Sequence, residues 1–314
     1  MRYRELGKTG LQVSEIGFGA WAVGGNAHGN SYGPTDDRAS LAAIQRAVEL
    51  GCNFFDTADV YGHGHSEEVL GQALKGHRDK VIIATKVGGD FYHGPPRMNF
   101  NPDSIEFALE KSCERLQTDY VDLYQLHNPP VQMIRNETLF RALEMLKEKG
   151  KIHHYGISIH DPKEGILAMK TGKPEAIQVV FNILRQDAKL QLFQAALESG
   201  VGIIAREPLA NGFLTGKHNA DETFPEGDIR HHFPRDYLLN LVLAAEQLKF
   251  LEGRNRTLAQ AALRFVLDQK EVSTVIPGAK TSQQVEENLS AWDLPPLTGE
   301  ELLRIRILRE QGFA

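Results

Sequence analysis

Short apolar runs alternate with amphipathic stretches along the whole chain. The apolar runs are rich in Val, Ile and Phe and are apolar at successive positions, which is typical of strands buried on both faces. They predict strands at 15–20, 53–58, 81–86, 120–127, 154–159, 176–182, 202–207 and 274–278. Apolar positions at helical spacing predict helices between them, at 36–50, 66–74, 101–116, 138–149, 162–169, 188–199 and 258–268.

Local signals mark the ends of several of these helices. Thr35 is the expected N-cap of the first helix, because its hydroxyl precedes two acidic residues. Pro102 takes the first helical position of the third helix, where a missing N–H does no harm. Gly150 follows the helix expected at 138–149 and is a good stop signal.

Strands that alternate with helices indicate a parallel sheet, and eight such units in roughly 250 residues are typical of a closed (β/α)8 barrel, or TIM barrel. Residues 1–13 precede the first strand and are expected to cap the bottom of the barrel. The segments 234–251 and 298–309 predict two extra helices outside the repeat. Because no linker-like segment interrupts 1–314, one domain is expected. A doubly wound open sheet is the alternative, but the glycines at 17–25 lack the spacing of a dinucleotide-binding turn.

Composition narrows the class of protein further. Hydrophobic residues make up 41% of the 314 residues and charged residues 24%, an ordinary balance for a globular protein. No apolar run reaches the ~18–20 residues of a membrane span, and no secretory leader is evident. A net charge of −6 without a basic stripe argues against a nucleic-acid partner. With only Cys52 and Cys113, a reducing, cytoplasmic location is expected. The oligomeric state cannot be predicted from these features.

Ionisable residues interrupt three successive strands near their ends. Asp56, Lys86 and His127 end the second, third and fourth predicted strands, and Tyr61 follows Asp56 in the next loop. Each residue alone fits a turn, a solvated loop or a packed rim. Active sites of such barrels lie where the strands end, and a buried Asp beside a buried Lys is costly unless the two are paired. Together these residues therefore indicate one site.

The motifs that carry these residues resemble the aldo-keto reductase family over nearly the whole chain. The matching motifs are Phe54-Phe55-Asp56-Thr57-Ala58-Asp59-Val60-Tyr61-Gly62 with Glu67, Leu70 and Gly71, then Ala84-Thr85-Lys86 and Leu126-His127. The resemblance implies an NAD(P)H-dependent reduction of a small-molecule carbonyl. Tyr61 would donate the proton, Lys86 would lower the phenol pKa, Asp56 would orient Lys86, and neutral His127 would position the carbonyl.

The same resemblance leaves a binding role open. Some members of the family are channel-associated subunits, so the alternative is a cofactor-holding redox sensor or binding subunit with slow turnover. A barrel aldolase that uses Lys86 as a Schiff base is a further rival, although it would require an unpaired lysine.

The resemblance also implies the residues that bind the cofactor. Gly19, Trp21 and Asp56 would lie beside it, and Ser158, Gln178 and Asn182 would hold the nicotinamide carboxamide. The pyrophosphate would lie under Pro208, Leu209, Gly212, Leu214, Gly216 and Lys217. Gly278, Lys280, Gln284, Glu287 and Asn288 would form the adenosine end. Lys280 near the expected 2′-phosphate favours NADP(H) over NAD(H), although Gln284 stands where the family commonly has Arg.

A second departure from the family pattern lies at the end of the seventh strand. Arg206 occupies the place of an aromatic residue that stacks on the nicotinamide, and its planar guanidinium is expected to stack there in the same way. The alternatives are a salt bridge with Glu207 or a contact with a neighbouring loop.

The loops 22–34, 88–100 and 221–233 are expected to form the substrate pocket. Its apolar walls would be Trp21, Phe91, Tyr92 and Phe100. Loop histidines at 28, 63, 65 and 93 lack the spacing of metal ligands, so no metal site is predicted.

Overall fold

The strands form one closed parallel barrel. The computed structural model describes residues 1–28, 31–171, 174–253 and 255–313. Neighbouring strands follow chain order: β3 (Phe18–Gly19), β4 (Phe54–Asp56), β5 (Ile82–Val87), β8 (Val121–His127), β9 (Ile152–Ser158), β10 (Ala176–Val180), β11 (Gly202–Arg206) and β12 (Val272–Val275). Parallel bridges Ile16–Val275 and Gly19–Gly278 join the first and last strands and close the ring. The predicted (β/α)8 fold is confirmed, and every predicted strand overlaps an observed one.

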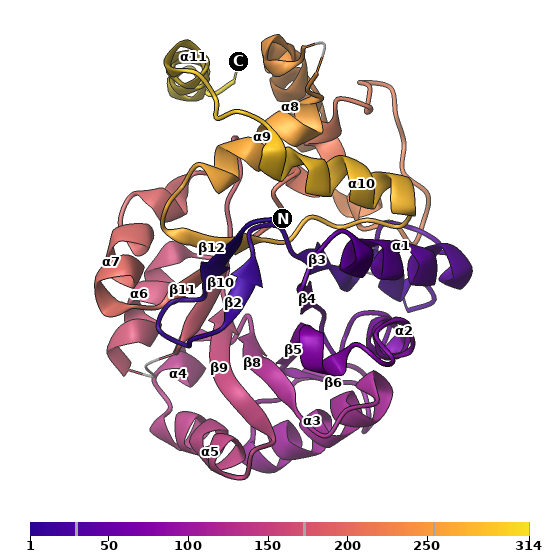
Figure 1. Ribbon diagram of the computed structural model, residues 1–314, viewed down its shortest axis with the longest axis vertical. Coiled ribbons are helices and arrows are strands. Elements are labelled where there is room, and N and C mark those ends of the chain that lie inside the picture. Colours follow the sequence, from indigo (N-terminus) through magenta and orange to yellow (C-terminus); the bar gives the residue numbers. More distant parts are fainter. Residues whose placement is uncertain (29–30, 172–173, 254, 314) are drawn as a thin grey trace.

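Helices surround the strands (Figure 1). They are α1 (Asp37–Glu49), α2 (His65–Ala73), α3 (Pro102–Leu116), α4 (Val131–Ile134), α5 (Glu137–Glu148), α6 (Pro162–Thr171), α7 (Leu192–Ser199), α9 (Leu258–Leu267) and α10 (Ser282–Ser290). Pro102 does open α3 and Gly150 follows the end of α5 with a positive φ, as predicted. Thr35 is not the cap of α1, because the Ala39 amide donates to Asp36 Oδ1 at 2.8 Å instead.

Two helices stand outside the eightfold repeat, as the sequence predicts. They are α8 (Arg235–Gln247) and α11 (Gly299–Glu310), which lie together at one side of the barrel (Figure 1). A full capping box at Thr298 and Glu301 defines the start of α11. Within the described residues, no helix has the length and apolar character needed to cross a membrane.

A hairpin plugs the bottom of the barrel. The strands β1 (Tyr3–Glu5) and β2 (Gln12–Ser14) pair in antiparallel register. Leu6 and Val13 are fully buried and join a cluster of barrel-interior side chains that includes Phe54, Leu123 and Ile204. The predicted N-terminal cap is therefore confirmed, and it closes the end of the barrel opposite the strand ends that carry ionisable residues.

We expect Leu6→Ala to lower the free energy of unfolding by ~2–5 kcal/mol, because a fully buried leucine leaves a cavity when it is truncated. Urea denaturation measures the change. Leu190→Ala is the control, since Leu190 is 70% exposed and its truncation should change stability by less than about 0.5 kcal/mol. Similar effects from both variants would show that the hairpin does not stabilise the barrel.

Candidate active site

One cleft of about 830 Å³ opens at the carboxyl ends of the strands. The predicted site residues that line it are Gly19, Trp21, Asp56, Tyr61, His127, Gln178, Arg206, Pro208, Leu209, Gly212, Lys217, Gly278, Lys280, Gln284, Glu287 and Asn288. Lys86 lies directly behind Asp56 and Tyr61. Ser158, Asn182, Leu214 and Gly216 are not among the lining residues.

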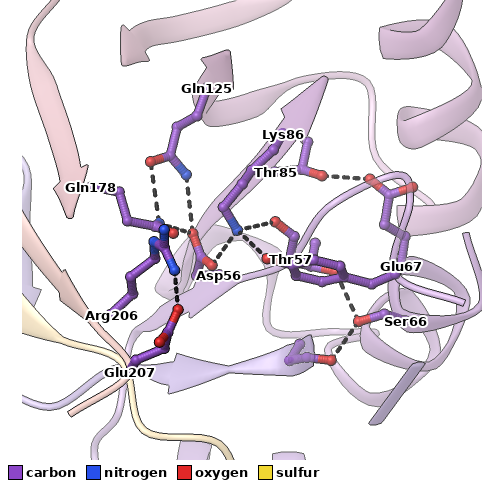
Figure 2. A network of polar contacts seen from close by, with 12 residues as sticks. Asp56, Thr57, Ser66, Glu67, Thr85, Lys86, Gln125, Gln178, Arg206 and Glu207 are labelled. Atoms are coloured by element: carbon purple, nitrogen blue, oxygen red, sulfur yellow. Dashed lines mark hydrogen bonds and ion pairs between the residues drawn. The ribbon is translucent and has the colours of Figure 1, made fainter. Parts of the chain in front are cut away.

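The predicted ion pair forms at the floor of this cleft (Figure 2). Lys86 Nζ donates to Asp56 Oδ1 at 2.5 Å and to the Thr57 carbonyl at 2.8 Å. Its third contact is with the phenol oxygen of Tyr61, at 3.1 Å. An ammonium group has three protons and no acceptor. All three donor positions of Lys86 are therefore used inside the protein, although its side chain is fully buried.

The other carboxylate oxygen of Asp56 is also occupied (Figure 2). Gln125 Nε2 donates to Asp56 Oδ2 at 3.0 Å, and Gln178 Nε2 donates to the same atom at 2.7 Å. Sequence reasoning missed Gln125, although a polar residue within the apolar strand β8 was a signal. With both amides in place, each oxygen of the buried carboxylate has a partner, as a buried charge requires.

A glycine next to Tyr61 fixes the turn that carries the phenol. Gly62 has a φ of +61°, and a Cβ there would lie 2.0 Å from the Gly24 carbonyl oxygen. Across the cleft floor, the rings of Tyr61 and His127 meet edge to face, with centroids 5.7 Å apart. The Trp21 ring lies 6.0 Å from that of Tyr61. The four residues predicted to be catalytic therefore come together at one point.

Burial is the largest influence on the pKa values of Tyr61, Lys86 and His127. Burial raises the pKa of Tyr61 above its ordinary value, and the positive charge of Lys86 lowers it, as expected, but only in part, so the net shift is upward. Burial acts most strongly and lowers the pKa of Lys86, but the charges and hydrogen bonds of Asp56 and Tyr61 together outweigh it, so the net shift of this pKa is upward. The pKa of His127 lies well below its ordinary value, because of burial and then the charge of Lys86. His127 is therefore neutral at neutral pH, as expected.

Ser158, Gln178 and Asn182 were predicted to hold a carboxamide, and they differ in how many of their hydrogen bonds are already used within the protein. Ser158 Oγ is buried and has no partner among the described residues. Gln178 uses its amide nitrogen on Asp56 and Gln125, which leaves its carbonyl oxygen for a ligand. Asn182 is fully engaged with the backbone, since Nδ2 donates to the Glu207 carbonyl at 2.8 Å and Oδ1 accepts two amides. It holds the turn after β10 and lies outside the cleft lining.

Arg206 lines the cleft but is tied to its neighbours. Its guanidinium pairs with Glu207 and donates to the Ile159 carbonyl at 3.2 Å. Adjacent strand residues normally point to opposite faces. Glu207 avoids this because its φ is +54°, a left-handed conformation that turns the chain as β11 ends. The salt bridge that the sequence left as an alternative therefore exists.

Lys280 is bound to a loop at the far end of the cleft. Its ammonium donates to the carbonyls of Tyr32, at 2.5 Å, and Pro34, at 3.0 Å. Tyr32 then reaches over the cleft and donates to Asn211 Oδ1 at 2.8 Å. Sequence reasoning missed both Tyr32 and Asn211. Two residues of the predicted loop 22–34, numbers 29 and 30, lie outside the described residues.

Three further predicted residues support the main chain of the segments expected to bind the cofactor. Leu214 is fully buried, and Gly216 ends the turn Ala210–Thr215 in a left-handed conformation. Gln284 Oε1 accepts the backbone amide of Lys280 at 2.7 Å. Leu214 and Gly216 support the main chain from outside the cleft lining, whereas Gln284 lines the cleft and also binds the main chain.

The aromatic residues predicted as substrate walls mostly lie elsewhere. Of these, only Trp21 lines the cleft. Phe91 stacks on His63 with ring centroids 4.6 Å apart and on Tyr92 at 4.2 Å. Phe100 is 7% exposed and packs in the core. These rings join loops to one another, and among the described residues no group of His, Cys, Asp or Glu is arranged to hold a metal.

The barrel fold and the cluster of Asp56, Tyr61, Lys86 and His127 are typical of an oxidoreductase. Comparison with known proteins identifies the family. The family model for the Aldo/keto reductase family matches residues 15–310. The chain therefore belongs to this family, whose members are oxidoreductases that act on carbonyl groups.

Similar proteins agree with this placement. The chain is 33% identical to the aldo-keto reductase yakc [NADP(+)] of Schizosaccharomyces pombe, over 89% of this chain and 84% of that protein. It is 31% identical to the NADH-specific methylglyoxal reductase of Escherichia coli, over 94% of each chain. The solved structure of aldo-keto reductase AKR11C1 from Bacillus halodurans matches with a TM-score of 0.81 and 32% identity, over 98% of this chain and 96% of that one.

We expect Lys86→Met to lower the free energy of unfolding by ~3–5 kcal/mol, because it leaves the buried Asp56 carboxylate without its cation. The matched control is the double variant Asp56→Asn with Lys86→Met, which removes both charges. Urea denaturation should show that the double variant recovers most of the loss. A double variant no more stable than the single one would show that packing, and not charge, explains the effect.

Proposed function

We propose that the protein reduces an aldehyde or ketone to an alcohol with NAD(P)H, and that Tyr61 donates the proton. The observation that carries the proposal is the direction of one hydrogen bond. Lys86 donates to the phenol oxygen, so that oxygen acts as the acceptor. The phenol proton is left to point into the cleft, toward a ligand.

The surrounding residues suit this chemistry. Lys86 stays charged beside the phenol and stabilises the phenolate that proton transfer creates. Asp56 with its two glutamine partners fixes the position of Lys86. Neutral His127 faces Tyr61 across the cleft and is suited to donate a hydrogen bond to the carbonyl oxygen. The paired, charged state of Lys86 is unsuited to a Schiff base, which disfavours the aldolase alternative.

The cleft fits a nicotinamide cofactor. When bound, such a cofactor supplies the hydride. Ser158 Oγ and the carbonyl oxygen of Gln178 match the acceptor and donor of a carboxamide. Gly212 and Gly278 both line the cleft, and neither has a side chain to cover its backbone. Main-chain groups there can approach the phosphates and sugars.

Steady-state kinetics distinguish this proposal from the alternative, which is a cofactor-holding sensor with slow turnover. A simple aldehyde such as nitrobenzaldehyde is the probe, with cofactor binding followed by fluorescence. Tight cofactor binding with no measurable reduction would favour the sensor.

We expect Tyr61→Phe to slow carbonyl reduction by ~10²–10⁴-fold, because a positioned acid contributes that much. Cofactor affinity, measured by fluorescence titration, should stay nearly unchanged. Tyr124→Phe is the control, since this buried phenol bonds to the Ile105 carbonyl at 3.1 Å and does not line the cleft. A Tyr61→Phe variant that keeps more than about a tenth of wild-type turnover in a single-turnover assay would exclude Tyr61 as the donor.

We further propose that NADP(H) is preferred over NAD(H) and that Lys280 reads the 2′-phosphate. To do so, the ammonium must exchange its two carbonyl partners for the phosphate. Lys280→Ala should then weaken NADPH binding about tenfold more than NADH binding, as expected for one charge-assisted hydrogen bond. Lys217→Ala, in the predicted pyrophosphate segment, should weaken both equally. Equal losses for Lys280→Ala would mean that this lysine only anchors the loop.

A further inference from the structure

A second buried ion pair lies behind the turn that carries Tyr61, and the mechanism above does not use it. Glu67, on α2, is fully buried, and Arg115, at the end of α3, is largely buried. Arg115 Nε and Nη2 both lie 2.7 Å from Glu67 Oε2. Buried ion pairs are weak evidence for stability, because desolvation offsets most of the attraction. Their geometry is the more informative property.

One end of this pair holds the strand that carries Lys86 (Figure 2). Thr85 Oγ1 donates to Glu67 Oε1 at 2.5 Å. Thr85 immediately precedes Lys86 on β5, and successive strand side chains point to opposite faces. Thr85 therefore points outward to α2, whereas Lys86 points inward to Asp56. Glu67 fixes the outer side of the strand at the residue next to the catalytic ammonium.

The other end of the pair supports the turn that carries Tyr61. Gly64 has a φ of +97°, and a Cβ there would lie 2.5 Å from Cδ and Nε of Arg115. The guanidinium thus packs directly against this turn. Arg115 Nη2 also donates to the Tyr92 hydroxyl at 2.8 Å, which prevents it from rotating away. At the start of α2, the Ser66 amide donates to the Tyr61 carbonyl at 3.2 Å.

The two supports meet at the contact between Lys86 and Tyr61. Coulomb attraction falls as distance grows, so lengthening this 3.1 Å contact by about 1 Å would raise the pKa of Tyr61 by about one unit at an effective dielectric constant of about 20. Small movements of the strand or the turn would therefore change the acid strength of the phenol.

We infer that Glu67 and Arg115 are positioning residues that set the distance between Lys86 and Tyr61. The inference rests on the proposed function, because it assumes that Tyr61 exchanges a proton with the substrate. Neither Glu67 nor Arg115 is among the residues that line the cleft. It acts through Thr85 on one side and through the Gly64 turn on the other.

Alcohol oxidation gives the most sensitive test. In that direction hydride leaves the alcohol carbon for the oxidised cofactor, and the Tyr61 phenolate accepts the hydroxyl proton. Below the pKa of Tyr61 only a fraction of the phenol is ionised, so a rise of one unit slows oxidation about tenfold at any such pH. Carbonyl reduction uses the protonated phenol, which is already abundant, and should slow by no more than about threefold.

The variants are Glu67→Gln and Thr85→Val, studied by single-turnover oxidation and reduction between pH 7 and 10. Both should displace the oxidation profile by about one pH unit toward higher pH, with cofactor affinity within about twofold of wild type. Arg115→Lys keeps the positive charge beside Glu67 and should displace the profile by less than Glu67→Gln does. Thermal unfolding of each variant shows how much of it is folded.

Asp122→Asn is the matched control, at the opposite end of the same strands. Asp122 Oδ2 accepts the Ile83 amide at 2.8 Å and pairs with Arg78 at 2.8 Å, so it also joins β8 to β5. This variant should lose stability without any displacement of the oxidation profile. If the wild-type enzyme is active and the oxidation profiles of Glu67→Gln and Thr85→Val match that of Asp122→Asn, this inference is overturned, whereas the proposed function is not. A wild type that binds cofactor but catalyses neither direction would overturn the proposed function, and this inference with it.

Discussion

The buried contact between Lys86 and Asp56 is the constraint on which the rest of the site depends. A buried charged group must make all its hydrogen bonds within the protein. The Asp56 carboxylate accepts hydrogen bonds from the Lys86 ammonium and from the side-chain amides of Gln125 and Gln178. Those partners come from β5, β8 and β10, so one carboxylate on β4 links four strands of the barrel. The phenol of Tyr61 joins this network through Lys86 and also lines the cleft. The acid strength of the Tyr61 phenol at the cleft therefore depends on the buried charges of Lys86 and Asp56 beneath it.

The sequence was sufficient to predict the fold and the clustering of Asp56, Tyr61, Lys86 and His127, because both follow from strong local patterns. Eight apolar strands that alternate with amphipathic helices are compatible with few folds other than a barrel. Asp56, Lys86 and His127 stand out because each ends such a run, and strand ends meet at one face. Gln125 stood out less, because a single amide in an apolar strand has no partner that spacing alone can identify.

What could not be predicted depends on side chains that meet across loops. Lys280 reaches two carbonyls of a loop almost 250 residues away in the chain, and no local pattern reports such a contact. The aromatic residues at 91, 92 and 100 looked like pocket walls, yet they stack between loops or enter the core. Asn182 was expected to face a ligand, but a turn required all of its hydrogen bonds. In the case of Tyr61, the opposing effects of burial and charge could be weighed only once the depth of burial was known.

The bridge between Ile16 and Val275 has a consequence for how the molecule is made. During synthesis the first strand must remain without one of its two neighbours until residue 275 has emerged. The strands β4, β5 and β8 pair with near neighbours in the chain, whereas ring closure joins segments from opposite ends and carries the entropy of a very long loop. The part of the barrel that holds Asp56, Lys86 and His127 can thus assemble well before the part that completes the cleft. Until closure, the edges of β3 and β12 are open to pairing with other chains, which makes this interval the one in which aggregation competes with folding.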